Sequence, residues 1–280
     1  RYNGNNTASD KGDSMKTTVN GIDIKYDDVG PADAPALIFI HGFPLNRTMW
    51  QPQMEALKGR YRLIAYDLRG HGESSLGEED FTMERFVQDL LGLMEALRIE
   101  KATLCALSMG GYIALNAAES HPERFNALVL CDTQCSADTP EGKAKRNTAI
   151  KAVQRDGVEP FAEGLLGKLF APGSFETNPQ AVAAAREMIT ATSALSLERS
   201  LRAMRERDET CSKLPSITVP VLVVVGEADK ISPPESARYL HENIEHSRLA
   251  VIKNAGHLSN LENPDAFNDA LKSFLDTLAK

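Results

Sequence analysis

The stretch that decides the fold is Ala102-Thr-Leu-Cys-Ala-Leu-Ser-Met-Gly-Gly111. Its first six residues are mostly apolar and predict a buried strand, and a helical pattern over residues 109–120 begins directly after Ser108. A serine in such a sharp turn has a strained backbone, so the residues two before and two after it must be small, as Ala106 and Gly110 are. We therefore predict that Ser108 is a nucleophile. The alternative is a serine that only caps the following helix.

Strand-like runs alternate with helical patterns on both sides of this stretch. The predicted strands of this alternation are residues 36–40, 62–66, 102–107, 127–131, 219–225 and 249–252, and the predicted helices are residues 48–58, 82–97, 109–120, 234–243 and 265–278. Apolar strands separated by helices indicate a parallel sheet with helices on both faces. Residues 17–26 add a strand pair that turns at Asn20-Gly21, the dipeptide that suits a tight hairpin. We expect an α/β fold with a mostly parallel, eight-stranded sheet.

The alternation stops between residues 136 and 213. This segment holds helical patterns without a convincing strand, and it is interrupted at Ala171-Pro172-Gly173 and at Asn178-Pro179. We interpret residues 136–213 as a helical cap inserted into a core made of residues 15–135 and 214–280. The single tryptophan, Trp50, is expected in that core rather than in a binding pocket.

The composition excludes several classes of partner. The 280 residues carry a formal net charge of -8 and contain no cluster of Lys and Arg, whereas binding to a phosphate backbone requires concentrated positive charge. The longest apolar runs are of strand size, far below the roughly 20 residues of a membrane-spanning helix. We expect no nucleic-acid partner, no membrane partner and a small molecule as the substrate.

The N-terminus and the cysteines bear on the location of the protein. Residues 1–14 are polar, lack the pattern of a secretion signal and predict a disordered tail. Because they precede Met15, an origin in an expression vector is the alternative to a native one.

Four cysteines are too few for a disulfide scaffold, and Cys105 and Cys131 lie in apolar runs. We expect reduced cysteines, no metal site at Cys131 and Cys135, and a cytoplasmic protein.

Two further side chains follow predicted strands and complete a set with Ser108. His257 comes after the last strand, where a loop can bring its imidazole over the strand ends, and a histidine exchanges protons near neutral pH. A solvated loop histidine is the alternative. Asp229 follows the preceding strand and is suited to orient that imidazole and stabilise its cation. Asp132, directly after another strand, and Glu227 are the alternatives for this acid.

Five segments, in order along the chain, resemble the α/β-hydrolase family. They are His41-Gly42-Phe43-Pro44, Asp67-Leu68-Arg69-Gly70-His71-Gly72-Glu73-Ser74, the turn at Ser108, Gly226-Glu227-Ala228-Asp229 and Asn254-Ala255-Gly256-His257. The resemblance runs from about Thr17 to the end of the chain, apart from the cap, and the order nucleophile, acid, base is that of the family. Within the family, the Ser-Met-Gly-Gly turn is most similar to that of 3-oxoadipate enol-lactonases and small serine carboxylesterases.

This resemblance implies the rest of the site. The backbone N–H groups of Phe43 and Met109 are expected to form an oxyanion hole, which stabilises the negative charge of a tetrahedral intermediate. Residues 67–74 are expected to shape the fold near the site, with Gly70 and Gly72 permitting sharp turns and His71 playing no catalytic role. No cofactor and no metal are implied.

These observations predict a serine hydrolase that cleaves the ester, lactone or thioester bond of a small organic molecule through an acyl-enzyme on Ser108. One alternative keeps the same residues for carbon–carbon bond hydrolysis, lyase or cofactor-free peroxidase chemistry. Another is a ligand receptor with negligible turnover. The cap decides the shape of the pocket, so the sequence leaves the acyl preference open.

Overall fold

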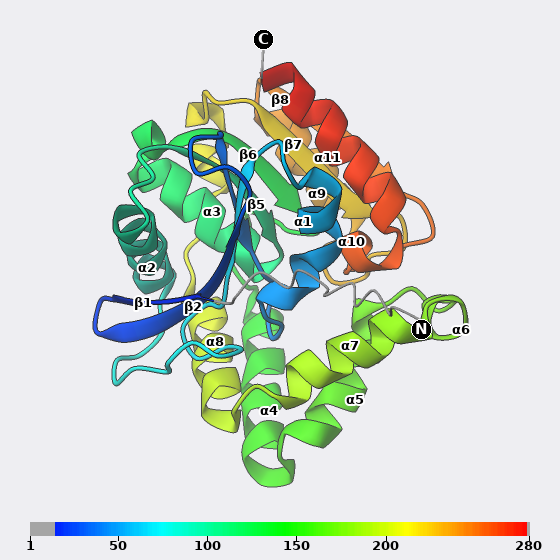
Figure 1. Ribbon diagram of the computed structural model, residues 1–280. Coiled ribbons are helices and arrows are strands. Elements are labelled where there is room, and N and C mark those ends of the chain that lie inside the picture. Colours follow the sequence, from blue (N-terminus) through cyan, green and yellow to red (C-terminus); the bar gives the residue numbers. More distant parts are fainter. Residues whose placement is uncertain (1–14, 279–280) are drawn as a thin grey trace, which may run out of the picture.

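An eight-stranded sheet forms the centre of the molecule, as the computed structural model shows for residues 15–278 (Figure 1). The expectation for residues 1–14 lies outside the described residues. The strands are β1 (Met15–Val19), β2 (Ile22–Val29), β3 (Ala36–Ile40), β4 (Arg62–Tyr66), β5 (Ala102–Leu107), β6 (Phe125–Cys131), β7 (Val221–Gly226) and β8 (Ser247–Ile252). Their order in the sheet is β1-β2-β4-β3-β5-β6-β7-β8.

The sheet is antiparallel at one edge and parallel elsewhere, which confirms the predicted fold class. β1 and β2 pair through a turn in which Asn20 and Gly21 have φ angles of 48° and 77°, the positive values that favour these residue types. β2 also runs antiparallel to β4, and all pairs from β4 to β8 are parallel. The carboxyl ends of β5, β6, β7 and β8 therefore meet at one edge.

Helices cover both faces of the sheet because successive strand residues point to opposite sides. In β3, Ile38 and Ile40 belong to one hydrophobic cluster, whereas Leu37 and Phe39 belong to the other. The first face is covered by α2 (Met83–Ala96), α3 (Met109–Ser120) and α9 (Pro234–Asn243), and the second by α1 (Gln51–Leu57) and α11 (Pro264–Leu278). Trp50 is fully buried in the second cluster, as predicted.

Five helices lie between β6 and β7 and form a layer below the sheet in the view of Figure 1. They are α4 (Pro140–Asp156), α5 (Val158–Leu169), α6 (Ser174–Thr177), α7 (Pro179–Thr190) and α8 (Ala194–Glu206), and we call them the helical insertion. The predicted interruptions separate α5 from α6 and α6 from α7. The side chain of Asn178 caps α7 by accepting a hydrogen bond from the backbone N–H of Ala181.

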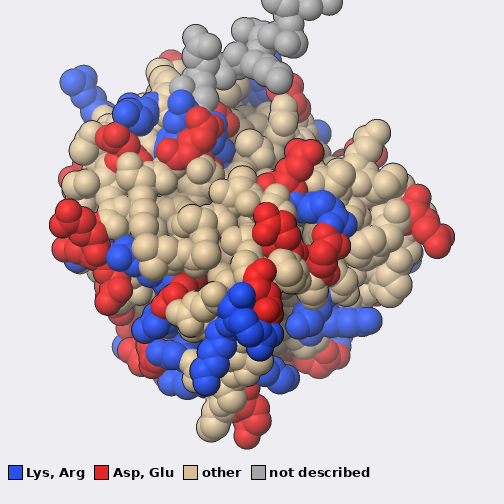
Figure 2. Space-filling view, turned by 90° about the horizontal axis from the view of Figure 1, so that it is seen from below, with Lys and Arg blue, Asp and Glu red and all other residues tan. Residues whose placement is uncertain are grey.

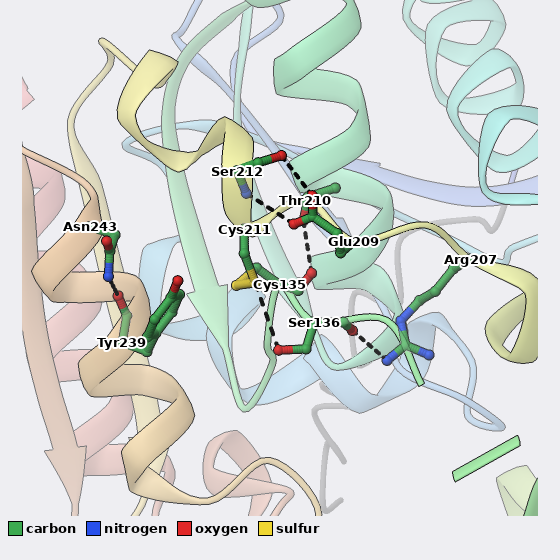
Figure 3. The surroundings of a disulfide bond; sticks show 9 residues. All are labelled: Cys135, Ser136, Arg207, Glu209, Thr210, Cys211, Ser212, Tyr239 and Asn243. Atoms are coloured by element: carbon green, nitrogen blue, oxygen red, sulfur yellow. Dashed lines mark hydrogen bonds between the residues drawn. A yellow bond between two sulfur atoms is a disulfide. The ribbon is translucent and has the colours of Figure 1, made fainter. Parts of the chain in front are cut away.

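The expectation that all four cysteines are reduced is wrong. Cys135 and Cys211 form a disulfide with an S–S distance of 2.08 Å (Figure 3). They lie 76 residues apart in sequence but meet because the chain leaves β6 and returns towards β7 along neighbouring paths. The backbone N–H of Thr210 donates to the carbonyl of Cys135 at 2.8 Å beside the bond. The disulfide therefore joins the two ends of the helical insertion, and it leaves Cys135 unavailable as a metal-binding thiol beside Cys131.

The charge on the insertion side of the molecule is mixed. Figure 2 views this side from below and shows Lys and Arg among Asp and Glu rather than an uninterrupted basic surface. On α8, for example, Arg202 pairs with Glu198 and Arg205 pairs with Glu206. Within residues 15–278, no helix is long and apolar enough to cross a membrane, and no group of three His, Cys, Asp or Glu side chains is placed to hold a metal ion.

Candidate active site

Ser108 lies in the turn between the end of β5 and the start of α3. Its backbone angles are φ 54° and ψ -112°, a region that residues with a side chain rarely adopt and that is strained. The serine occupies the position before the helix, but its side chain makes no capping hydrogen bond to the helix. The alternative of a simple helix cap is therefore wrong. The hydroxyl oxygen instead lies 2.9 Å from Nε2 of His257.

The turn at Ser108 fits the fold only because its neighbours are small. A Cβ atom on Gly110 would lie 2.5 Å from the carbonyl oxygen of Ile40 in the adjacent strand, and one on Gly111 would lie 2.4 Å from the hydroxyl of Thr133. Thr133 uses that hydroxyl to donate a 2.8 Å hydrogen bond to the carbonyl of Ser108. The close packing that requires glycine here also fixes the position of the serine.

His257 joins Ser108 to Asp229. Its Nδ1 atom lies 2.8 Å from Oδ2 of Asp229, while Nε2 faces the hydroxyl of Ser108. A carboxylate only accepts hydrogen bonds, so Nδ1 carries the proton and Nε2 is left to accept from the serine. All three side chains are buried, with exposed fractions of 8%, 3% and 2% for Ser108, Asp229 and His257. The structure thus brings together the three residues that the sequence predicted, from three different strand ends.

The backbone that follows Asp229 holds its carboxylate in place. Its other oxygen, Oδ1, accepts hydrogen bonds from the N–H groups of Ile231 at 2.8 Å and Ser232 at 3.1 Å. The two oxygens therefore have separate partners, and only Oδ2 faces the imidazole. Such hydrogen bonds stabilise the charged carboxylate and fix its orientation.

Asp132, the main alternative for the acid, lies nearby but does not contact His257. Its Oδ1 accepts a 2.8 Å hydrogen bond from the N–H of Gly226, and its Oδ2 accepts a 2.5 Å hydrogen bond from the hydroxyl of Ser259. Burial, and then the charge of Asp229, raise the pKa of Asp132 well above its usual value. Glu227, the weaker alternative, is exposed, and its carboxylate accepts a long 3.4 Å hydrogen bond from the N–H of Asn254.

The predicted oxyanion donors lie on the two segments that flank Ser108. Met109 is the first residue of α3, where backbone N–H groups have no carbonyl partner within the helix. Phe43 lies in the loop after β3, next to Gly42, whose Cβ would approach the Cβ of Ser108 to 3.3 Å. A hydrogen bond from the N–H of Leu45 to the carbonyl of Gly42 closes this loop. Both predicted donors thus belong to segments that pack directly on the serine.

Residues 67–74 form a tight loop around a buried carboxylate, Asp67. It accepts hydrogen bonds from the N–H groups of Arg47 at 2.8 Å and Glu73 at 2.9 Å. Gly70 and Gly72 have φ angles of 73° and 52°, the positive values predicted for sharp turns, and a Cβ on Gly72 would collide with the Asp67 carboxylate. These contacts give the loop the shaping role that was expected.

Sequence reasoning missed three side chains that support the site. Thr133 contacts the nucleophile segment, Ser259 binds Asp132, and Glu262 binds the loop that carries His257. Each acts through side-chain hydrogen bonds to another segment, so no periodic pattern or spacing could have found it. The only available signal was their position next to strand-end residues already selected.

The chain belongs to the α/β hydrolase fold family, whose model matches residues 35–264. Among its relatives, 3-oxoadipate enol-lactonase 2 of Acinetobacter baylyi is 34% identical over 92% of this chain and 95% of the relative. A solved structure of a thermophilic esterase from Thermogutta terrifontis matches with a TM-score of 0.90 at 35% identity, covering 95% of this chain and 99% of the esterase. The enol-lactonase from Burkholderia xenovorans matches with a TM-score of 0.88 at 30% identity, covering 94% of this chain and all of that one.

Proposed function

We propose that this protein is a serine hydrolase that cleaves the ester or lactone bond of a small organic molecule through an acyl-enzyme on Ser108. The observation that carries the proposal is the unbroken line of hydrogen bonds from the Ser108 hydroxyl through His257 to Asp229. A serine, a histidine and an aspartate in this arrangement form the catalytic triad of acyl-transfer enzymes. The backbone strain at Ser108 supports the same role, because strained residues cluster at functional sites.

The steps of the reaction follow from the protonation of the triad, in which Nδ1 of His257 and the hydroxyl of Ser108 each carry a proton. His257 accepts the proton of the Ser108 hydroxyl at Nε2 as the serine oxygen attacks the carbonyl carbon of the substrate. Asp229 stabilises the imidazolium that forms and keeps its ring oriented. His257 then gives the proton to the leaving alcohol, which leaves an acyl group on Ser108. Water, activated by the same histidine, attacks this ester and releases the acid.

The N–H groups of Met109 and Phe43 are the proposed donors to the oxyanion of the tetrahedral intermediates. Two backbone donors held by packing need no rearrangement as charge develops, and the loss of one such donor typically costs about 3 to 4 kcal/mol of transition-state stabilisation. The start of α3 adds the favourable end of a helix dipole. The proposal requires no cofactor and no metal, because every proton transfer uses a side chain already in place.

The substrate class is inferred from the relatives together with the site. Two of them are described as enol-lactonases and one as an esterase, and a lactone is a cyclic ester that the same attack opens. Thioesters follow the same chemistry. The helical insertion is proposed to be the cap that closes over the site, with residues 15–135 and 214–280 as the core. The partner is proposed to be a small molecule and not nucleic acid.

A cytoplasmic location stays a prediction. The Cys135–Cys211 disulfide argues against this location, because disulfides persist mainly in oxidising compartments. Quantifying free thiols in protein isolated without reductant from its native cells tests this point. Two free thiols support an oxidised pair, and four support a reducing location.

Covalent labelling of the serine tests the proposed function. A serine-directed organophosphate should add one group to the intact protein, since only an activated serine reacts readily. Ser108→Ala should not take up the label, and steady turnover of p-nitrophenyl acetate should disappear with it. Equal labelling of Ser108→Ala and the unchanged protein would contradict the proposal. A single burst of product without recovery would instead support a receptor with negligible turnover.

A further inference from the structure

Glu262 connects the loop that carries His257 to the helical insertion. One carboxylate oxygen, Oε1, accepts a 2.7 Å hydrogen bond from the N–H of Gly256, the residue directly before His257. The other, Oε2, accepts a 2.8 Å hydrogen bond from the N–H of Ala171 and a 2.5 Å hydrogen bond from the hydroxyl of Ser174. A single side chain at the end of α10 (Ser259–Glu262) thus holds two segments that are far apart in sequence.

The same two segments also meet without the help of Glu262. The backbone N–H of His257 donates to the carbonyl of Leu169 at 2.8 Å. Gly256 packs so closely on the insertion that a Cβ atom there would lie 2.6 Å from the nitrogen of Ala171 and 3.0 Å from the carbonyl oxygen of Leu169. The position of the histidine backbone therefore depends on where residues 169–174 of the insertion lie.

The loop that carries the acid is linked to this assembly as well. The N–H of Ala228, the residue before Asp229, donates to the carbonyl of Ala255 at 2.8 Å. A shift of residues 255–257 would move the imidazole relative to both Asp229 and Ser108. Because hydrogen bonds weaken steeply with distance and misalignment, small movements of this loop affect both contacts of the ring.

We propose that Glu262 is a positioning residue for His257: it fixes the loop of the general base and ties that loop to residues 169–174 of the insertion. The proposal rests on the proposed function, in which His257 is the base. Its consequence is that the cap and the loop of His257 move together. A displacement of the cap at Ala171 or Ser174 should therefore displace the imidazole through the hydrogen bonds of Glu262.

The chemistry of the contact explains why a carboxylate occupies this position. Glu262 faces three donors, and an ionised carboxylate can accept from all of them. A glutamine has one oxygen only. If that oxygen faces Gly256, its NH2 group faces the N–H of Ala171, and if it faces Ala171, its NH2 group faces the N–H of Gly256. Glu262→Gln can therefore accept from only one of the two backbone N–H groups, at nearly unchanged volume, although its NH2 group can still donate to the hydroxyl of Ser174 when its oxygen faces Gly256.

The experiment compares Glu262→Ala, Glu262→Gln and Ser174→Ala with Glu176→Gln as the matched control. The control removes a carboxylate from an exposed position on α6, close in sequence to the residues that Glu262 binds. The kcat and KM of p-nitrophenyl acetate hydrolysis are obtained from rates over a range of substrate concentrations that extends to saturation. The downfield proton NMR signal of the hydrogen bond between Nδ1 of His257 and Asp229 reports the position of the ring without any turnover, and urea unfolding reports stability.

Glu262→Ala should lower kcat by roughly tenfold to a hundredfold with a small change in KM, because a displacement of about 1 Å in a catalytic group has effects of this size. Its downfield signal should broaden or vanish through exchange with solvent. Glu262→Gln should give an intermediate loss, Ser174→Ala a smaller one, and Glu176→Gln none.

A purely structural role predicts a different result. Lower stability with unchanged kcat and an unchanged downfield signal in both Glu262 variants would overturn the proposal, and if Glu262→Ala does not fold, Glu262→Gln decides alone. Failure of the proposed function is distinguishable: the unchanged protein would then show no turnover, whereas the NMR signal would still show whether Glu262 positions His257.

Discussion

His41 and His71 lie beside each other with ring centroids 5.3 Å apart, although they belong to separate sequence segments. Both are fully buried. Nε2 of His41 accepts a 3.0 Å hydrogen bond from the N–H of Leu68, and Nδ1 of His71 lies 3.0 Å from the carbonyl of Arg69. Burial, as the main cause, lowers the pKa of His41 to about 4 and the pKa of His71 to about 3. The two rings are neutral in the folded protein.

This pair predicts a loss of stability in acid. A histidine that is neutral when folded but has a pKa of about 6.5 when unfolded favours unfolding as the pH falls below 6.5. Its contribution is complete above about pH 6.5 and is lost progressively towards the folded pKa values of about 4 and about 3. The raised pKa values of Asp67 and Asp132 act in the opposite direction, so a difference between variants is the cleaner measurement.

His71→Asn keeps a donor for the Arg69 carbonyl but cannot titrate. We expect the difference in unfolding free energy between the unchanged protein and this variant to shrink by about 2 kcal/mol between pH 7.5 and pH 5, from one proton bound by the unfolded chain. Urea unfolding at both pH values measures it. A difference that stays constant would show that His71 does not titrate on unfolding.

The disulfide should stabilise the molecule as a whole. The disulfide closes a loop with a sequence separation of 76 and so lowers the conformational entropy of the unfolded chain. In the loop-entropy model this raises the free energy of unfolding by about 4 kcal/mol, and measured values are often smaller. The double variant Cys135→Ser, Cys211→Ser should therefore unfold at lower urea, and a reductant should destabilise the unchanged protein by a similar amount. The control is the reductant on the double variant, where a further loss would point to some other effect of the reductant.

Two glycines should respond in opposite ways to the same substitution. Gly110→Ala forces a Cβ to within 2.5 Å of a backbone carbonyl of β3, which cannot move aside, so we expect a loss of activity of more than about tenfold through displacement of Ser108. Gly167→Ala in α5 meets nothing within 4 Å and should be neutral or stabilise the helix by up to about 1 kcal/mol. Similar kcat values for the two variants would refute the steric argument.

Much of this molecule could be predicted from the sequence because its strands are short, apolar and separated by clear helical patterns. β3, β4 and β5 and helices α3 and α9 begin and end at the predicted residues. Ser108, Asp229 and His257 could be selected because parallel strands place residues that follow them at one edge. In the insertion, the proline and glycine positions predicted the breaks between α5, α6 and α7.

The features that could not be predicted from the sequence depend on contacts between segments that are distant along the chain. Cys135 and Cys211 carry no local signal of pairing, since only the paths of the chain into and out of the insertion bring them together. Glu262 looks like any acidic residue at the end of a short helix until its carboxylate is seen to bind Gly256 and Ala171. Sequence order likewise left Asp132 open as the acid, because it follows a strand just as Asp229 does.

The assignment of the acid yields the sharpest prediction, because the two aspartates have different hydrogen-bond partners. In Asp229→Asn, the amide oxygen should take the place of Oδ1 and keep the bonds from Ile231 and Ser232. The NH2 group then faces Nδ1 of His257, which must give up its proton to accept this bond. The proton moves to Nε2, which can no longer accept from Ser108. We expect kcat to fall on the order of 10⁴-fold, as wrong-tautomer variants of serine proteases do.

Asp132→Asn should lower kcat far less than Asp229→Asn, because of the hydrogen bonds that Asp132 makes. Burial and the charge of Asp229 favour the neutral form of Asp132, so a neutral asparagine is a mild change. Its amide oxygen can keep the hydrogen bond from the N–H of Gly226, and its NH2 group can donate to the hydroxyl oxygen of Ser259, which in the unchanged protein donates to Asp132. Both variants are compared with one activated ester, and circular dichroism establishes that both are folded. A near-normal kcat for Asp229→Asn together with a collapse for Asp132→Asn would move the acid to the end of β6. Equal and severe losses would mean that Asp132 fixes Gly226 and Ser259 so firmly that the loops of the acid and of the base act as one unit.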